Sequence, residues 1–317
     1  MAQIALIGIG AGAASALLFA SVASGSPIAI LLFYLAPLPI LIAALGWSHW
    51  AALVAAVAAA AGLAIALGSY FFFAFLFGIG LPAWWLGYLT LLARPGASGD
   101  LEWYPVGRVV LWAAILGTLV VVAAVPTIGL DEQTFHETLR KGFERILRAT
   151  QNSATQNGDA STDRLIEFFV RIIPPLAGTL STVVSLIDLW LAGKVVKMSG
   201  RLTRPWPELS LMRLPPIATA LLAVGVIACF LPGLVGIVAG VLVSTLLVVY
   251  ALAGLAVLHF ITRGMTSRGL LLGGTYTALI VFGWPVLLMS LFGLVDSAVD
   301  LRTRFGRSGG PPGRPST

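Results

Sequence analysis

The chain has 317 residues, of which 58% are hydrophobic and 10% are charged, and its mean hydropathy is +0.97. These values lie outside the range of soluble globular domains, so the composition excludes an ordinary water-soluble fold. A net charge of +6 would suggest nucleic-acid binding in a soluble chain. Here the basic residues lie mainly beside apolar runs, where the positive-inside rule and anionic lipid account for them. We therefore expect a lipid bilayer as the main partner and no nucleic acid.

Apolar runs of about 20 residues, each long enough to cross a bilayer, follow one another along the chain. Unpaired backbone groups are costly in hydrocarbon, so such runs must form helices or barrel strands. Residues 51–67 lack the apolar–polar alternation of a barrel strand, which favours helices. We therefore predict an all-α, polytopic transmembrane helical bundle with eight to nine spans. The apolar runs cover residues 3–24, 27–45, 48–67, 70–93, 108–128, 166–193, 216–231, 234–261 and 271–294.

The segment after the sixth run is the strongest cytoplasmic signal, because it holds five basic residues and a single acidic one, Glu208. The basic residues are Lys194, Lys197, Arg201, Arg204 and Arg213. Nine spans would put the basic C-terminal tail on the opposite side, against the same rule. We therefore favour eight true crossings with both termini inside, in a multi-pass protein of the cell inner (cytoplasmic) membrane.

Composition divides the chain into four parts. Residues 1–128 and 166–296 hold the transmembrane helices, residues 129–165 form a hydrophilic insertion, and residues 297–317 form a basic tail that we expect to be disordered. The insertion begins with an amphipathic pattern typical of a surface helix and continues as a flexible linker. The apolar face of that helix consists of Phe135, Leu139, Phe143 and Ile146. This helix either packs on its own bundle, or it is an in-plane helix at the membrane surface or the docking site of a partner.

A polar stripe crosses the sixth run, where residues at alternating steps of three and four share one face of a helix. Its polar members are Arg171, Ser181, Ser185 and Asp188, which we take as candidates for a ligand or ion pathway. A charged residue in mid-membrane is costly, so Asp188 should face a cavity, water or a cation. In the alternative interpretation Arg171 reaches one interface, and Asp188 pairs with Lys194 or a loop arginine near the other.

Small residues recur at four-residue steps in the first run, at Gly8, Gly12, Ala16 and Ala20. Such a face lets a second helix approach closely. That second helix belongs either to this chain or to a separate membrane subunit.

Patterns that would indicate catalysis or metal binding are missing. The lone Cys229 has no partner, and the three histidines show no ligand spacing, so we expect neither a metal site nor a cofactor. Hydrolase, metalloprotease and phosphate-loop motifs are also missing, which argues against an enzyme.

Four segments together resemble the YybS-like predicted membrane proteins, a family without an assigned function. They are residues 34–40 (YLAPLPI), 202–209 (LTRPWPEL), 254–264 (GLAVLHFITRG) and 293–304 (GLVDSAVDLRTR). That family is in turn similar to the substrate-binding S components of energy-coupling factor transporters. This resemblance implies a small-molecule substrate and a polar pocket on the outer side of the membrane. It also implies a membrane coupling subunit that docks on the face of Gly8, Gly12, Ala16 and Ala20.

The function we expect is therefore that of a transporter-like subunit that binds a small molecule within the membrane. The alternative is a non-transporting scaffold that uses the small-residue face and the surface helix. A lipid-modifying enzyme ranks third.

Overall fold

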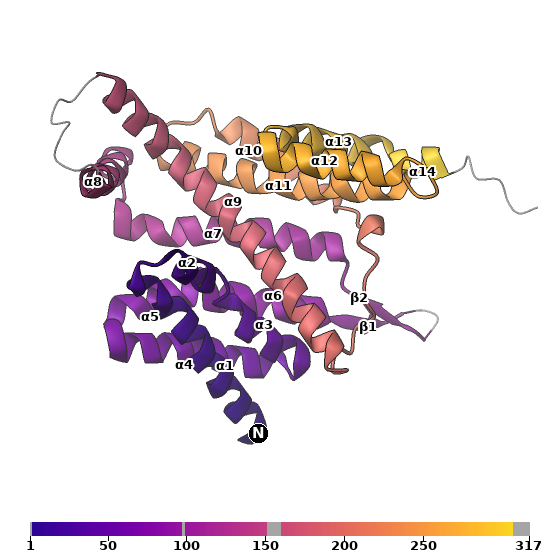
Figure 1. Cartoon of the computed structure of the whole chain (residues 1–317), viewed down its shortest axis with the longest axis horizontal. Helices are drawn as coiled ribbons and strands as arrows, with labels where there is room; N and C mark the ends of the chain where they lie inside the picture. Colours follow the sequence, from indigo (N-terminus) through magenta and orange to yellow (C-terminus); the bar gives the residue numbers. More distant parts are fainter. Residues whose placement is uncertain (1, 97–98, 151–159, 307–317) are drawn as a thin grey trace, which may run out of the picture.

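The computed structural model of the chain describes residues 2–96, 99–150 and 160–306. Helices make up most of this part and confirm the predicted all-α, polytopic helical bundle (Figure 1). The described residues contain one pair of strands. The helices that precede it are α1 (Ala2–Ala20), η1 (Ser21–Ser24), α2 (Pro27–Tyr34), α3 (Pro37–Gly46), α4 (His49–Leu67), α5 (Ser69–Phe75), the π-helical η2 (Leu76–Gly80) and α6 (Leu81–Leu91). The pair, β1 (Ala93–Pro95) and β2 (Leu101–Trp103), is antiparallel with Ala93 opposite Trp103. After it come α7 (Val106–Ile128), α8 (Glu132–Thr150), α9 (Ala160–Met198), η3 (Leu209–Leu211), α10 (Pro216–Ala228), α11 (Leu234–Ile261), α12 (Arg268–Phe282), α13 (Pro285–Val299) and α14 (Leu301–Gly306).

Local sequence sets several of these helix boundaries. The hydroxyl groups of Ser26 and Ser48 each accept a hydrogen bond, at 3.2 Å, from a backbone N–H in the first turn of α2 and α4. Gly68, with φ of 108°, ends α4 in a conformation that side chains disfavour. Short polar or glycine turns therefore separate apolar helices, as the hydropathy pattern predicts.

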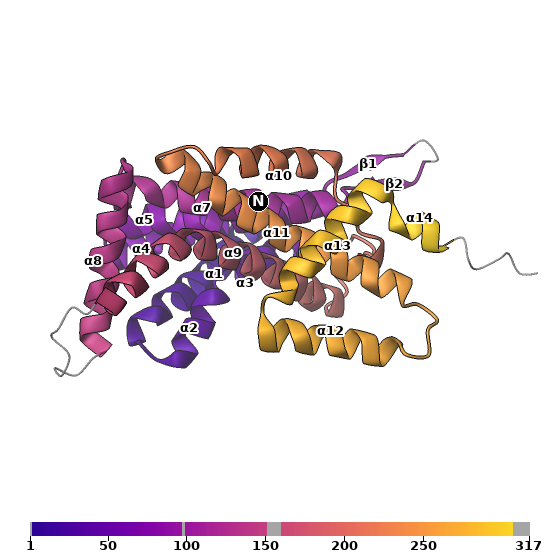
Figure 2. The ribbon, with the colours of Figure 1, turned by 90° about the horizontal axis from the view of Figure 1, so that it is seen from above.

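The described residues contain seven segments that are long and apolar enough to cross a membrane, and three shorter apolar helices. The shorter ones are α10, α12 and α13. One sequence prediction was wrong here: residues 271–294 do not form a single span. The chain reverses at Gly283, whose φ is 69°, and Pro285 begins α13, so α12 and α13 lie as a hairpin (Figure 2).

Most helices run to and fro along the long axis of the molecule; the described chain ends with α14 at the right-hand end of Figure 1, whereas α1 begins at the lower edge, near the middle of that axis. Arg213, just before α10, forms an ion pair of 3.0 Å with Asp300, just after α13. Arg201, just after α9, donates to the carbonyl oxygen of Gly46 at 3.2 Å, and α1 runs parallel to the adjoining α4. The last apolar run forms two short helices, α12 and α13, in place of one span.

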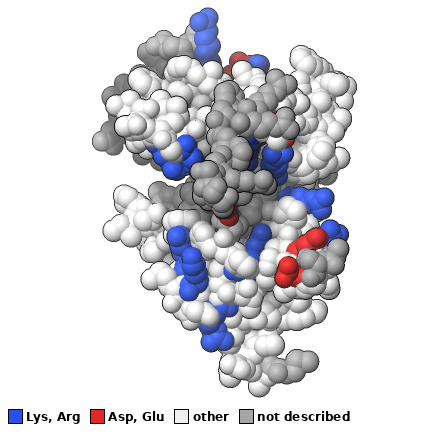
Figure 3. Space-filling model, turned by 90° about the vertical axis from the view of Figure 1, so that its right-hand side faces the viewer, with Lys and Arg blue, Asp and Glu red and all other residues white. Residues whose placement is uncertain are grey.

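This end of the bundle is basic, and we call it the basic end. Figure 3, which faces it, shows Lys and Arg side chains spread over the surface. The basic residues at this end include Arg201, Arg204, Arg213, Arg263 and Arg268. The positive-inside rule therefore predicts that the basic end faces the cytoplasm. The opposite end carries α8, where Glu132 accepts a hydrogen bond of 2.9 Å from the backbone N–H of Gly233.

Cysteine labelling in intact cells tests this arrangement. With Cys229 replaced by Ser, we expect cysteines at Lys197 and Thr303 to be blocked only by reagents that enter the cytoplasm. The native Cys229 is exposed and follows α10 at the α8 end, so it should react from the opposite side and serves as the matched control. Labelling of Lys197→Cys and Thr303→Cys from different sides would contradict the placement of both positions at one end of the bundle.

Two clusters of buried side chains form the core, with α9 between them. The first, the N-terminal cluster, draws on α3, α4 and α6 and includes Ala192 and Val196 of α9. The second, the C-terminal cluster, draws on α7, α10 and α11 and includes the fully buried Tyr250. Figure 1 shows α9 crossing diagonally between the layer of α1–α6 and the layer of α10–α13.

The small-residue face of α1 is covered by α4 of the same chain. A Cβ atom at Gly8 would lie 2.7 Å from Val54, and one at Gly12 would lie 2.6 Å from the carbonyl oxygen of Ala55. Ala16 and Ala20 pack against the N-terminal cluster. Close approach of small residues therefore serves internal packing here, and the docking of a separate subunit on this face does not fit the geometry.

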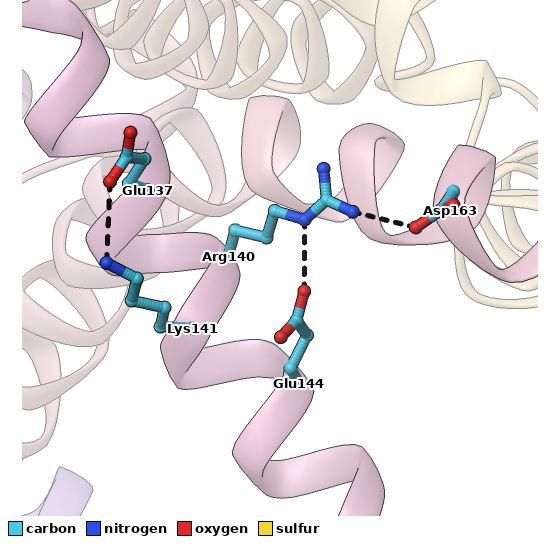
Figure 4. A network of polar contacts seen from close by, with 5 residues as sticks. All are labelled: Glu137, Arg140, Lys141, Glu144 and Asp163. Atoms are coloured by element: carbon cyan, nitrogen blue, oxygen red, sulfur yellow. Dashed lines mark hydrogen bonds and ion pairs between the residues drawn. The ribbon is translucent and has the colours of Figure 1, made fainter. Parts of the chain in front are cut away.

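The amphipathic helix of the insertion, α8, packs on its own bundle. Phe135 is buried, Leu139 is half-buried, and the ring of Phe143 stacks on Phe169 of α9 with centroids 4.9 Å apart. The side chain of Ile146 lies outside the described residues. Figure 4 shows Arg140 reaching both Glu144, at 3.0 Å, and Asp163 at the start of α9, at 2.7 Å.

The insertion is shorter than predicted, and so is the tail. α9 begins at Ala160, so residues 160–165 are helical and extend a membrane helix; of the predicted linker, residues 151–159 lie outside the described part. At the C-terminus, α13 continues to Val299 and α14 covers Leu301–Gly306, so only residues 307–317 of the predicted tail are left undescribed.

Candidate functional site

The polar stripe of α9 does not act as a single site. Arg171 is exposed near the α8 end and forms an ion pair of 2.6 Å with Glu167, one turn earlier. Ser181 and Ser185 are half-buried, and Asp188 is buried with 1% of its surface exposed. Arg171 therefore lies toward one interface, as the alternative interpretation predicts, while Asp188 lies inside the bundle.

Asp188 has no ion-pair partner among the residues that the structure describes, and its Oδ2 atom lacks a hydrogen-bond partner among them. The cation that the alternative interpretation proposed, Lys194, lies over the ring of Trp206 at 4.6 Å. The predicted pairing of Asp188 with Lys194 is therefore not formed. A buried polar atom without a partner is uncommon in proteins and requires an explanation.

A group of threonines lies where α7, α9 and α11 cross, and sequence reasoning missed it. The hydroxyl oxygens of Thr118 and Thr245 are 3.1 Å apart, and Thr182 donates to the carbonyl oxygen of Gly178 at 2.9 Å. A Cβ at Gly117 would lie 2.7 Å from that same carbonyl oxygen. A hydroxyl group that hydrogen-bonds to its own helix or to another hydroxyl costs little free energy in a membrane helix. This group of threonines therefore holds the helices together, and its hydroxyls are already hydrogen-bonded within the protein.

A cavity of about 500 Å³ lies at the basic end, between α7, α9, α11 and α12 and beneath the segment that follows α9. Its walls are mostly apolar, with Val110, Leu186, Leu189 and Leu252 among them. A second, smaller hollow shares Leu186, Trp190 and Leu252 and continues along α9 and α11. The volume is within the range of sites that bind small molecules.

Basic and polar side chains line one part of the cavity. They come from the end of α11, the start of α12 and the segment after α9, and they are Arg204, Ser210, His259, Arg263, Arg268 and Tyr276. His259 and Tyr276 are joined by a hydrogen bond of 3.0 Å, and Arg263 pairs with Glu208 and Ser210. Arg268 is half-buried and has no ion-pair partner among the described residues. Of the three arginines, Arg263 pairs with an acid and Arg204 donates to two carbonyl oxygens, whereas Arg268 has neither kind of partner among the described residues.

Arg204 fixes the segment after α9 over the cavity. Its guanidinium donates to the carbonyl oxygen of Thr90 at 2.8 Å and to that of Tyr104 at 2.9 Å. Burial lowers the pKa of Arg204, although the two carbonyl oxygens satisfy part of its hydrogen-bonding capacity. Arg204 therefore connects this segment to α6 and to the residue that follows β2.

The sequence did not predict this cavity, although segments that carry the family resemblance form part of its lining. Residues 202–209 and 254–264, two of the segments that carry the family resemblance, both contribute to the walls. A third, residues 293–304, lies beside them, because Arg302 donates to the carbonyl oxygen of Ser210 at 2.9 Å. Only folding brings these segments together, since they are far apart along the chain.

The described residues contain no group of three or more His, Cys, Asp or Glu side chains that could hold a metal ion. Searches of curated proteins and of solved structures gave no match. One family model matches residues 13–297, and its description is "Predicted membrane protein (DUF2232)". The helices, the apolar surface and this match over most of the chain agree, and the chain belongs to the DUF2232 family of predicted membrane proteins.

Proposed function

We propose that this protein binds an anionic amphipathic small molecule within the membrane, as a transporter-like subunit without catalytic activity. The observation that carries the proposal is the cavity at the basic end, with apolar walls and an arginine, Arg268, that lacks a counter-ion among the described residues. An apolar body would lie along α9 and α11. A carboxylate or phosphate group would accept hydrogen bonds from Arg268, with His259 and Tyr276 nearby.

The position of α12 supports entry from the lipid. None of its residues is buried, and it nevertheless supplies Arg268 and Tyr276 to the cavity. A helix that borders a cavity without packing into the core can move aside at little cost in buried apolar surface. This arrangement suits a ligand that partitions into the bilayer.

The geometry supports binding more than scaffolding. Both features that suggested a scaffold, the small-residue face of α1 and the apolar face of α8, pack inside this chain. The proposal also departs from the S-component resemblance, which implies a polar pocket on the outer side. This cavity is mostly apolar and lies at the end predicted to face the cytoplasm.

Native mass spectrometry of the full-length protein tests the proposal. We expect it to retain phosphatidylglycerol or palmitate in preference to phosphatidylcholine, and Arg268→Gln to weaken retention about tenfold or more, as expected for a lost charge-assisted hydrogen bond. Arg94→Gln is the control, because Arg94 is exposed on β1 at the same end and pairs with Glu102. Equal retention of the three lipids, or equal effects of the two variants, would contradict the proposal.

A further inference from the structure

We propose that Asp188 is a proton-binding site at the interface between α9 and α3, on the opposite side of α9 from the cavity. The cavity is lined by Leu186, Leu189, Trp190 and Gly193 of α9. Asp188 instead shares a helix face with Ala192 and Val196, which follow at steps of four. The proposal therefore does not depend on the ligand proposed above.

This face of α9 packs into the N-terminal cluster. Ala192 and Val196 are both buried there, and a Cβ at Gly46, the last residue of α3, would lie 3.6 Å from Val196. Asp188 lies one turn before Ala192 and has 1% of its surface exposed. Its carboxyl group is therefore shielded from both water and lipid.

The helices that pack against α9 near Asp188 supply no cation for it. α3 contains no ionisable residue and α6 contains only Tyr88, as their sequences show. The one cation of α7, Arg108, is exposed and lies over the ring of Tyr104 at 5.9 Å. The charged residues of α8 lie at the far end of α9, where Arg140 pairs with Asp163.

α11 offers no counter-ion either. Its two ionisable residues are Tyr250, which shares a hydrogen bond of 2.8 Å with Thr219, and His259, which is bonded to Tyr276. Within α9 itself, the nearest basic residue is Lys194, and it lies over Trp206. On the elements that pack around Asp188, each charged or titratable group is therefore exposed, hydrogen-bonded to another residue or, for Lys194, placed over an aromatic ring. The exception is Tyr88, which carries no charge.

An ionised carboxylate in this place would be buried without compensation, and such groups take up a proton instead. Asp188 then holds its proton on a carboxylate oxygen while α9 and α3 remain packed. Release of the proton to water leaves a charged carboxylate that needs hydration, so it requires the interface to open. Because linkage is reciprocal, proton release and opening of the interface favour each other.

Infrared spectroscopy of the full-length protein at neutral pH tests the protonation state. We expect the difference spectrum between the native chain and Asp188→Asn to contain the carbonyl band of a neutral carboxylic acid. Asn has the shape of the protonated acid and cannot ionise, so this variant should fold. A difference spectrum with carboxylate bands and no acid band would overturn the proposal.

Cysteine reactivity tests the coupling. In a chain with Cys229→Ser, Ala192→Cys reports on the interface, and Val195→Cys, at an exposed position of the same turn, is the matched control. As pH rises, we expect Ala192→Cys to become more reactive with Asp188 present than with Asp188→Asn. Above the pH at which Asp188 begins to lose its proton, the ratio of the two rates should grow by up to tenfold per pH unit, the slope of one linked proton. Val195→Cys should show no such difference, and an unchanged ratio at Ala192→Cys would overturn the coupling.

Discussion

Replacing Gly254 of α11 with Ala should destabilise the protein by more than any conservative change on the bundle surface. A Cβ at Gly254 would collide with the carbonyl oxygen of Met289 in α13 and lie 3.1 Å from the backbone nitrogen of Gly293. Both neighbours are backbone atoms, so no side-chain rotation relieves the collision, and the two helices must separate. We expect a cost at or above the upper end of the ~1–3 kcal/mol typical of overpacking, measured as loss of thermal stability in detergent.

The matched control lies in the same helix. Nothing lies within 4 Å of a Cβ built at Gly240, so Gly240→Ala meets no obstacle. Because Ala favours a helix over Gly by roughly 0.5–1 kcal/mol, this variant should be neutral or slightly stabilising. The same substitution should therefore lower the thermal stability at Gly254 and leave it unchanged or raise it slightly at Gly240. Equal losses of stability would show that α11 and α13 are not in close contact.

Replacing Arg302 with Met should also be strongly destabilising. Arg302, at 3% side-chain exposure, lies 3.3 Å from Asp296, at 10%, and it donates to the carbonyl oxygen of Ser210. The Arg302–Asp296 contact is close enough for an ion pair, although its angles do not make a hydrogen bond. Burial lowers the pKa of Arg302, and the charge of Asp296 opposes that shift. Removing Arg302 leaves the charge of Asp296 buried without a partner. We therefore expect the free energy of unfolding, measured with denaturant, to fall by about 3–5 kcal/mol.

Two further variants separate the charge effect from lost packing. The double variant Arg302→Met with Asp296→Leu removes both buried charges and should recover most of the stability. Arg94→Met removes one partner of an exposed pair, Arg94 and Glu102, and should cost less than about 1 kcal/mol. A double variant as unstable as Arg302→Met alone would show that side-chain volume, not an unpaired charge, causes the loss.

The sequence by itself determined the class of fold and most helix positions. Hydropathy is a property of each segment, and hydrocarbon leaves an apolar segment such as residues 51–67 little choice except a helix. Helix boundaries also follow from local sequence, because a cap such as Ser48 of α4 bonds to a residue close to it in the chain. The helical period also identified α8 and its apolar face correctly at Phe135 and Phe143.

Only the tertiary structure decided what each helix face contacts, because contacts between helices depend on residues far apart in sequence. The spacing of Gly8 and Gly12 was compatible with a partner subunit or with this chain, and α4 occupies the face. The hairpin of α12 and α13 depends on a positive φ at Gly283, which a continuous apolar run conceals. The cavity is likewise built from segments distant in sequence, so hydropathy could show that the chain lies in a membrane but could not locate its binding site.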